Sequence, residues 1–90
     1  MIRAHLFISG RVQCVFFRST MCQKARQFNI YGFVKNLPDG NVEAVLEGEE
    51  EKVEKLVEWA KKGTFLAKVK EIEIIKEDYK GEFENFEIIY

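Results

Sequence analysis

The stretch GRVQCVFFR, Gly10–Arg18, decides the fold of this chain, because it joins a strand pattern to a helix pattern through a short loop. Every second residue from Ile2 to Ile8 is apolar, which is typical of a strand with one buried face. After the stretch, apolar residues recur at helical spacing: Phe17, Met21, Ala25 and Phe28. The sequence therefore predicts a strand, a loop and a helix in that order.

The loop between these two elements has the properties of an anion site. The first turn of a helix has unpaired N–H groups and the positive end of the helix dipole, so an anion can bind there without a metal. Arg18 adds a planar, permanently charged guanidinium suited to phosphate oxygens. We expect the phosphate loop to comprise Gln13, Cys14, Val15, Phe16, Phe17 and Arg18. In the purely structural alternative to an anion site, Arg18 is a solvated residue of the first helical turn and Gly10 only marks the end of the strand.

The rest of the chain predicts an α+β fold. Residues 31–37 and 42–47 read as two strands joined by a Pro-Asp-Gly turn, with Asn29 as the cap of the preceding helix. A second helix runs from residue 49 to near Gly63, and strands follow at 67–77, with one irregularity, and at 86–90. The order β-α-β-β-α-β plus a short terminal strand predicts a ferredoxin-like α/β sandwich, with two helices on one face of a mainly antiparallel sheet. We expect residues 1–90 to form one domain.

Composition and charge exclude several classes of protein. Apolar residues make up 47% of the chain and charged residues 32%, which is typical of globular proteins. The net charge of −1 argues against a nucleic-acid partner, and no apolar run approaches the length of a membrane span. The N-terminus does not resemble a signal peptide, so we expect a cytoplasmic protein in which Cys14 and Cys22 are reduced thiols. Abundant Glu and Lys suggest a thermophilic origin as a hypothesis.

Asn36 is a second candidate site residue. It lies at the end of the predicted strand at 31–37, in phase with Val34, and its amide can both donate and accept a hydrogen bond. Such a group can orient a water molecule. Asn36 also fits a purely structural role, because asparagine is common at the start of turns.

Together these residues match a known pattern. Gly10-Arg11-Val12-Gln13-x-Val15-x-Phe17-Arg18, followed by Gly32-Phe33-Val34-x-Asn36-x-x-Asp39-Gly40-x-Val42, closely resembles the two signature segments of the acylphosphatase family. The resemblance implies the fold described above and hydrolysis of the carboxyl–phosphate bond of acyl phosphates. It also implies that Arg18 holds the phosphoryl group and that Asn36 positions the attacking water.

The residue content agrees with this chemistry. A carboxylate is a good leaving group, so the protein needs mainly to position the phosphoryl group and stabilise its charge. The single histidine, His5, lies well upstream on the first strand, where we expect it to be structural. The two aspartates are far apart, so no carboxylate cluster for Mg²⁺ is evident. We therefore expect no metal, no cofactor, and small acyl phosphates and inorganic phosphate as the only ligands, with no membrane or obligate protein partner.

Two positions depart from the family pattern. Cys14 stands where the family usually has glycine, so if the loop needs a positive φ there, this chain either bears a conformational cost or adopts a different local geometry. A thiol beside an anion site is also a conceivable redox handle, although an inert substitution is the simpler interpretation. After Gly63, the usual prolines are missing, which affects the loop before the strand at 67–77 more than the site.

Two other function classes fit the same fold. Tyr31-Gly32-Phe33-Val34-Lys35 has a faint similarity to the base-stacking segment of RNA-recognition domains, but it falls on the second strand instead of the third, and the chain lacks basic excess. A phosphate-binding module without catalysis is the other alternative. Turnover of an acyl phosphate would distinguish an enzyme from an RNA-binding domain and from a phosphate-binding module.

Overall fold

The computed structural model describes all 90 residues, in seven regular elements. Five strands and two helices follow in the order β-α-β-β-α-β-β, as the sequence predicted. Their bounds are β1 Ile2–Arg11, α1 Phe17–Gln27, β2 Tyr31–Asn36, β3 Val42–Gly48, α2 Glu50–Lys62, β4 Lys68–Glu77 and β5 Phe86–Ile89.

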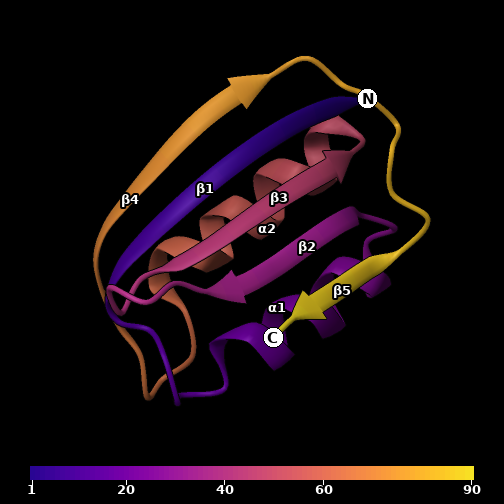
Figure 1. Cartoon of the computed structure of the whole chain (residues 1–90). Helices are drawn as coiled ribbons and strands as arrows, with labels where there is room; N and C mark the ends of the chain where they lie inside the picture. Colours follow the sequence, from indigo (N-terminus) through magenta and orange to yellow (C-terminus); the bar gives the residue numbers. More distant parts are fainter.

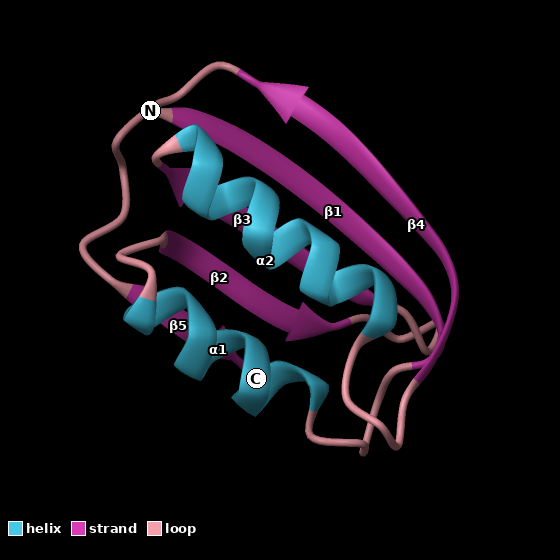
Figure 2. Ribbon diagram, turned by 180° about the vertical axis from the view of Figure 1, so that it is seen from behind, coloured by secondary structure: helices cyan, strands magenta, loops and turns pink.

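The strands form one sheet in the order β4-β1-β3-β2-β5 (Figure 1). Every neighbouring pair is antiparallel except β2 and β5, which run parallel. Both helices cover the same face, with α1 over β2 and β5 and α2 over β1 and β3 (Figure 2). This is the predicted ferredoxin-like sandwich, and the fold prediction is confirmed.

The core lies between the helices and the sheet, and its pattern follows the predicted periodicity. On β1, Ala4, Leu6 and Ile8 are buried toward the helices, while the residues between them lie on the open face. On α1, Phe17, Met21 and Ala25 are buried at the spacing read from the sequence. The helix ends one residue before the end of its apolar pattern, because Phe28, and not the predicted Asn29, is its C-cap, and Asn29 adopts the left-handed conformation just beyond it (φ 56°).

A bulge in the β1–β4 pair sets the position of the loop that follows β1. Ser9 pairs with Glu71 but Gly10 pairs with Val69, so Lys70 of β4 is the extra residue and the predicted irregularity is confirmed. Gly10 has φ 117°, and a Cβ there would lie 2.1 Å from the carbonyl oxygen of Lys68. Only glycine fits this close approach, so Gly10 does more than end a strand.

Candidate active site

The loop between β1 and α1 exposes a row of backbone N–H groups. Cys14 and Phe16 both adopt the left-handed conformation, with φ of 61° and 63°. Left-handed residues at alternate positions turn successive amides toward one side, which is the geometry of an anion-binding nest. Phe16 is also the N-cap of α1, and no side chain caps that helix. The first amides of α1 therefore have no side-chain partner and remain available to an acceptor.

The side chains of this loop divide into anchors and exposed groups. Val15 and Phe17 are buried, and the Phe17 ring lies 5.1 Å from that of Trp59 on α2. Cys14 and Phe16 point to solvent. Buried Val15 and Phe17 can contribute to an anion site only through the backbone, so their side chains fix the loop and their amides remain available.

Two hydrogen-bonding side chains fasten the loop to its neighbours. Gln13 Nε2 donates to the carbonyl oxygens of Leu37 and Asn41, each at 2.9 Å, which ties the loop to the β2–β3 turn. Thr64 Oγ1 donates to the carbonyl oxygen of Val15 at 2.8 Å. The sequence predicted Gln13 as part of the loop but gave no partner for its side chain. Thr64 was not predicted at all.

Arg18 lies in the first turn of α1 and is half-buried. None of the ion pairs in the structure includes it. Its guanidinium carbon lies 5.1 Å from the centre of the Tyr90 ring, a cation–π contact that holds the side chain beside the loop. Arg18 is thus a positioned cation with no anionic partner in the protein.

Asn36 ends β2, where it pairs with Val42. Its amide oxygen Oδ1 is buried and has no hydrogen-bond donor, and it is the one buried side-chain polar atom in this state. Buried polar atoms are almost always paired, because an unpaired one costs about 1–3 kcal/mol. The protein itself supplies no donor to this oxygen, which leaves it available to a hydrogen-bond donor from outside the chain.

Two contacts bring Asn36 and Arg18 into one region. The Gln13 bonds hold the loop against Leu37, the residue directly after Asn36. On the other side, β5 pairs with β2 so that Ile89 lies opposite Lys35, which brings Tyr90 level with Asn36, and Tyr90 contacts Arg18. The loop, Arg18 and Asn36 therefore all lie at the same end of the sheet.

The positive φ of Cys14 predicts that glycine at this position increases the free energy of unfolding. A left-handed non-glycine residue costs about 1–2 kcal/mol, whereas glycine costs about 0.5–1 kcal/mol through the unfolded chain. We expect Cys14→Gly to raise the free energy of unfolding by about 0.5–1 kcal/mol, measured by urea denaturation under reducing conditions. Cys14→Ala, which keeps the strain and removes the thiol, is the control. Equal stabilisation by both variants would assign the effect to the thiol instead of the backbone.

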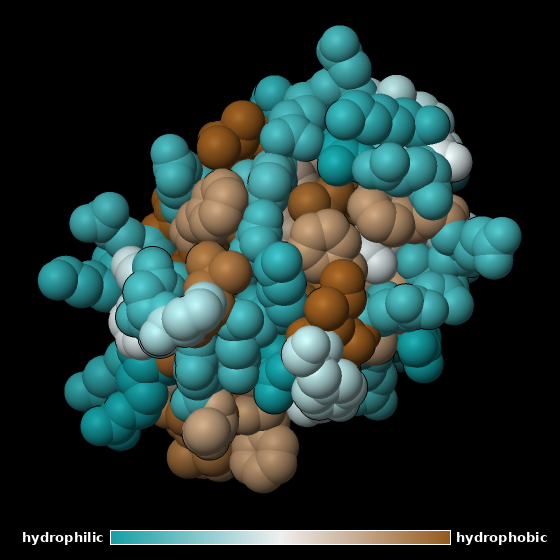
Figure 3. Space-filling model, in the orientation of Figure 1, coloured by the Kyte–Doolittle hydropathy of each residue, from teal (hydrophilic) through white to brown (hydrophobic).

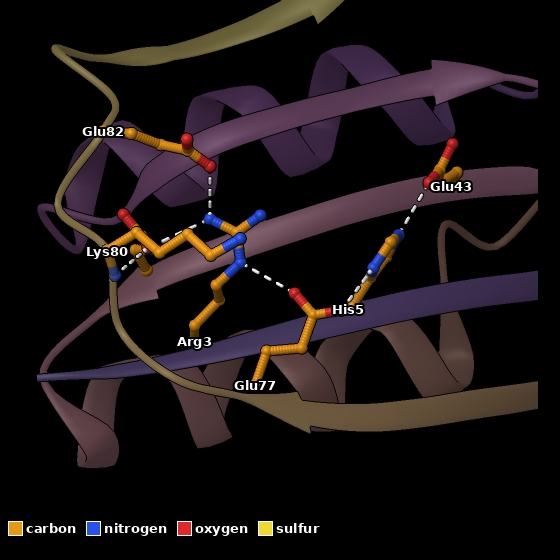
Figure 4. Close-up of polar contacts among 7 residues, drawn as sticks. Arg3, His5, Glu43, Glu77, Lys80 and Glu82 are labelled. Atoms are coloured by element: carbon orange, nitrogen blue, oxygen red, sulfur yellow. Dashed lines mark hydrogen bonds and ion pairs between the residues drawn. The ribbon is translucent and has the colours of Figure 1, made fainter.

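A second polar cluster lies away from the loop, on the sheet face opposite the helices (Figure 4). Arg3 is its centre and is 8% exposed. The Arg3 guanidinium bonds Glu77 at 2.8 Å, Glu47 at 3.1 Å and Glu82 at 2.6 Å. Burial opposes the charged form of Arg3, but the hydrogen bonds to Glu77, Glu82 and Glu47 outweigh it and raise its pKa. Because Glu82 lies in the segment between β4 and β5, the cluster joins that segment to the sheet.

His5 belongs to this cluster and not to the loop. Its Nδ1 lies 2.9 Å from Glu77 and its Nε2 lies 2.6 Å from Glu43. Two carboxylate partners require an N–H on both ring nitrogens, which only the protonated ring has. Burial lowers the pKa of His5, but the hydrogen bonds to Glu77 and Glu43 prevail and raise it above 6.5. The histidine thus holds three strands together, in agreement with the structural role predicted for it.

The His5 contacts predict how stability depends on pH. Below the ordinary pKa of 6.5 the ring is protonated in both the folded and unfolded states, and the contacts contribute fully. As pH rises through the raised pKa of the folded state, we expect the free energy of unfolding to fall. The hydrogen bonds from Arg3 and His5 lower the pKa of Glu77 below 4.5, so stability also falls in acid. Urea denaturation as a function of pH measures this change in the free energy of unfolding. The variant His5→Gln should lack the loss of stability at alkaline pH. Because His5 is the only histidine, its pKa can be measured directly by NMR titration.

The structure contains no group of three or more His, Cys, Asp or Glu side chains placed to hold a metal ion. None of its helices has the length and apolar character needed to cross a membrane. Cys14 and Cys22 are both free thiols; Cys14 is exposed and Cys22 is buried.

Comparison with known proteins identifies the family. The family model "Acylphosphatase" matches residues 4–88. An acylphosphatase from Syntrophobacter fumaroxidans is 50% identical, with 98% of this chain and 91% of that protein covered, and one from Pyrobaculum islandicum is 51% identical, with 98% and 94% covered. A crystal structure of acylphosphatase from Bacillus subtilis superposes with a TM-score of 0.95 at 33% identity, covering both chains completely. With this fold, these two signature segments and these relatives, the chain belongs to the acylphosphatase family.

Proposed function

We propose that this protein hydrolyses acyl phosphates to a carboxylate and inorganic phosphate, with Arg18 and the amides of residues 13–18 binding the phosphoryl group and Asn36 positioning the attacking water. The observation that carries the proposal is the unpaired oxygen of Asn36. A water molecule that donates one hydrogen bond to Oδ1 satisfies this buried acceptor and presents its own lone pair to a phosphorus atom held by the loop.

The reaction then needs little further chemistry from the protein. A bond forms between the water oxygen and phosphorus, the bond from phosphorus to the acyl oxygen breaks, and its electron pair leaves with the carboxylate. The proton released by the water passes to a phosphoryl oxygen or to solvent. Carboxylates leave without protonation, so the side chains supply position and charge stabilisation instead of acid–base catalysis. Arg18 is available for this role because it has no ion-pair partner in the protein, whereas His5 is held between Glu43 and Glu77.

The same proposal includes independence from metals and cofactors. The phosphoryl charge is compensated by one guanidinium and a set of backbone dipoles, which together take the place that Mg²⁺ holds in other phosphoryl-transfer proteins. The proposed reaction takes place in the cytoplasm on small acyl phosphates and uses no nucleic acid, membrane or obligate protein partner.

Hydrolysis of benzoyl phosphate in excess EDTA tests this function. We expect turnover that EDTA leaves unchanged, followed as release of inorganic phosphate and corrected for spontaneous hydrolysis. Binding of inorganic phosphate without turnover would instead identify a phosphate-binding module. Activity that EDTA abolishes and Mg²⁺ restores would disprove metal independence.

A further inference from the structure

A cavity of about 230 Å³ lies on the sheet face opposite the helices, at the end of the sheet where β1 begins. Its lining consists of Met1, Tyr31, Glu47, Tyr79 and Phe83, and we call it the Glu47 cavity. We propose that the Glu47 cavity binds a small alkylammonium ion, whose N–H group donates to the Glu47 carboxylate and whose alkyl chain lies against the aromatic rings. No residue of the loop between β1 and α1 lines this cavity, so it is separate from the phosphoryl site.

The register of the sheet places Glu47 in this cavity. Tyr31 lies opposite Glu47, and Glu47 lies opposite Arg3, so these side chains form a row across β2, β3 and β1 on the open face. The segment between β4 and β5, residues 78–85, curves past the same end of the sheet (Figure 1). This segment supplies two further walls, Tyr79 and Phe83. Residues from distant parts of the chain therefore build one cavity around one carboxylate.

Glu47 offers the cavity an acceptor that the protein leaves unpaired. Its side chain is 2% exposed, and both hydrogen bonds that it accepts go to Oε2, from Arg3 at 3.1 Å and from the backbone N–H of Lys80 at 3.0 Å. Its other oxygen, Oε1, has no donor. Because Asn36 Oδ1 is the only fully buried side-chain polar atom without a partner, Glu47 Oε1 keeps contact with the open space of the cavity. A nearly buried carboxylate favours a charged donor.

The ion pairs around Glu47 leave one negative charge unbalanced. Four carboxylates and three cations are joined in one network, with the histidine counted as protonated. The carboxylates belong to Glu43, Glu47, Glu77 and Glu82, and the cations to Arg3, His5 and Lys35. The N-terminal ammonium forms none of the ion pairs in the structure. A monovalent cation in the cavity would therefore balance the network.

The walls suit an organic cation better than a metal ion. Figure 3 shows this face of the molecule, where hydrophobic side chains lie among hydrophilic ones. Aromatic rings attract cations, and the Arg3 guanidinium already lies 5.5 Å from the centre of the Phe83 ring. Mg²⁺ and Ca²⁺ take about six to eight oxygen ligands, whereas this cavity offers one carboxylate and two phenols. A cavity of roughly 150 Å³ holds benzene, so the cavity has room for a short alkyl chain.

Gly81 helps to position the ring of Tyr79. Gly81 has φ 63°, and a Cβ there would lie 3.1 Å from Tyr79 Oη and 3.3 Å from the nearest ring carbons. A side chain at this position would be strained and would crowd the ring. Tyr79 is 46% exposed, yet its ring rests against a backbone that only glycine fits well. A wall that is ordered before the ligand arrives lowers the entropic cost of binding.

Titration with butylammonium chloride, followed by NMR of the aromatic side chains, tests the proposal. We expect saturating shifts of the Tyr31, Tyr79 and Phe83 resonances, with a Kd of about 1–10 mM. 1-Butanol has the same alkyl chain without the charge and should bind about 10-fold more weakly or less. Sodium chloride at the same concentration should not reproduce the shifts. Equal binding of 1-butanol, or shifts confined to other residues, would overturn the proposal.

Two variants locate the site. Glu47→Gln removes the charge with little change of shape, and we expect the affinity for butylammonium to fall about 10-fold or more. Tyr79→Ala removes an aromatic wall and should weaken binding about 5-fold, whereas Tyr79→Phe should retain it. Glu87→Gln and Tyr90→Ala are the matched controls, because both residues are exposed and neither lines the cavity.

Urea denaturation verifies that each variant folds. Because Tyr79 is partly exposed, Tyr79→Ala still tests the site if Glu47→Gln is unfolded. Unchanged affinity in Tyr79→Ala would refute the aromatic wall and the proposal with it. A loss in Tyr90→Ala equal to that in Tyr79→Ala would place the amine outside this cavity and would also refute the proposal.

Discussion

Arg18→Ala is expected to lower kcat/KM for benzoyl phosphate by about 1,000-fold and to weaken inhibition by inorganic phosphate about 10-fold or more. Arg18 is the one charged side chain among the residues that line the cavity of about 230 Å³ beside the β1–α1 loop, and it has no internal carboxylate partner. Its removal leaves only backbone dipoles to compensate the phosphoryl charge. Because the ground-state phosphate and the transition state both carry this charge, KM should rise as kcat falls. Steady-state kinetics and phosphate inhibition measure both quantities.

Two variants sharpen this test. Arg18→Lys keeps the charge but loses the planar fork, so we expect an intermediate loss. Arg11→Ala removes an exposed arginine at the end of β1, outside the cavity lining, and should retain full turnover. A loss in Arg11→Ala equal to that in Arg18→Ala would show that general positive charge, and not the placement of Arg18, binds the phosphoryl group.

The fold was predictable because each element has a local signal. The alternation before Gly10 marks β1, the apolar spacing after Phe17 marks α1, and a Pro-Asp-Gly turn separates β2 from β3. Each of these patterns depends on residues close together in the sequence, and each predicted element is present in the structure. The boundaries shifted by about one residue where neighbouring elements decide them, as at Phe28, which caps α1 instead of continuing it.

The site was only partly predictable, because its remaining features depend on contacts between distant segments. The motif placed Arg18 and Asn36 in the sequence. It did not show that Gln13 bonds the β2–β3 turn, that Thr64 supports the loop, or that Tyr90 contacts Arg18. The last contact follows from the parallel pairing of β5 with β2, which no local pattern specifies.

The backbone of Cys14 is strained, and the sequence pointed to this position before the structure was known. The sequence raised the question of strain, because the family usually has glycine at this position. The structure answers it with φ 61°, so the cost is present and the loop keeps its geometry despite it. The neighbouring anchors Val15 and Phe17 are buried, and they hold the strained residue in place.

Asn36→Ala is expected to lower kcat for benzoyl phosphate by about 100-fold while KM changes little. By analogy with the loss of one preorganised donor in other active sites, about 3 kcal/mol of barrier lowering disappears. In the proposed mechanism Asn36 acts on the water and not on the phosphoryl group, so we expect inhibition by inorganic phosphate to persist. Asn85→Ala, which truncates an exposed asparagine between β4 and β5, is the control and should leave kcat unchanged. A rise in KM at constant kcat would exclude the water-positioning role.

The same substitution should have the opposite effect on stability. Alanine removes the one buried side-chain oxygen that has no donor, so we expect the free energy of unfolding to stay constant or to rise by about 1 kcal/mol. A residue that costs stability in the free protein and lowers the barrier of the reaction serves the reaction at the expense of the fold. A large loss of stability in Asn36→Ala would instead indicate that Asn36 holds the β2–β3 turn, and its loss of activity would then reflect a displaced loop. Urea denaturation and steady-state kinetics on the same sample therefore distinguish a group that positions water from one that supports the turn.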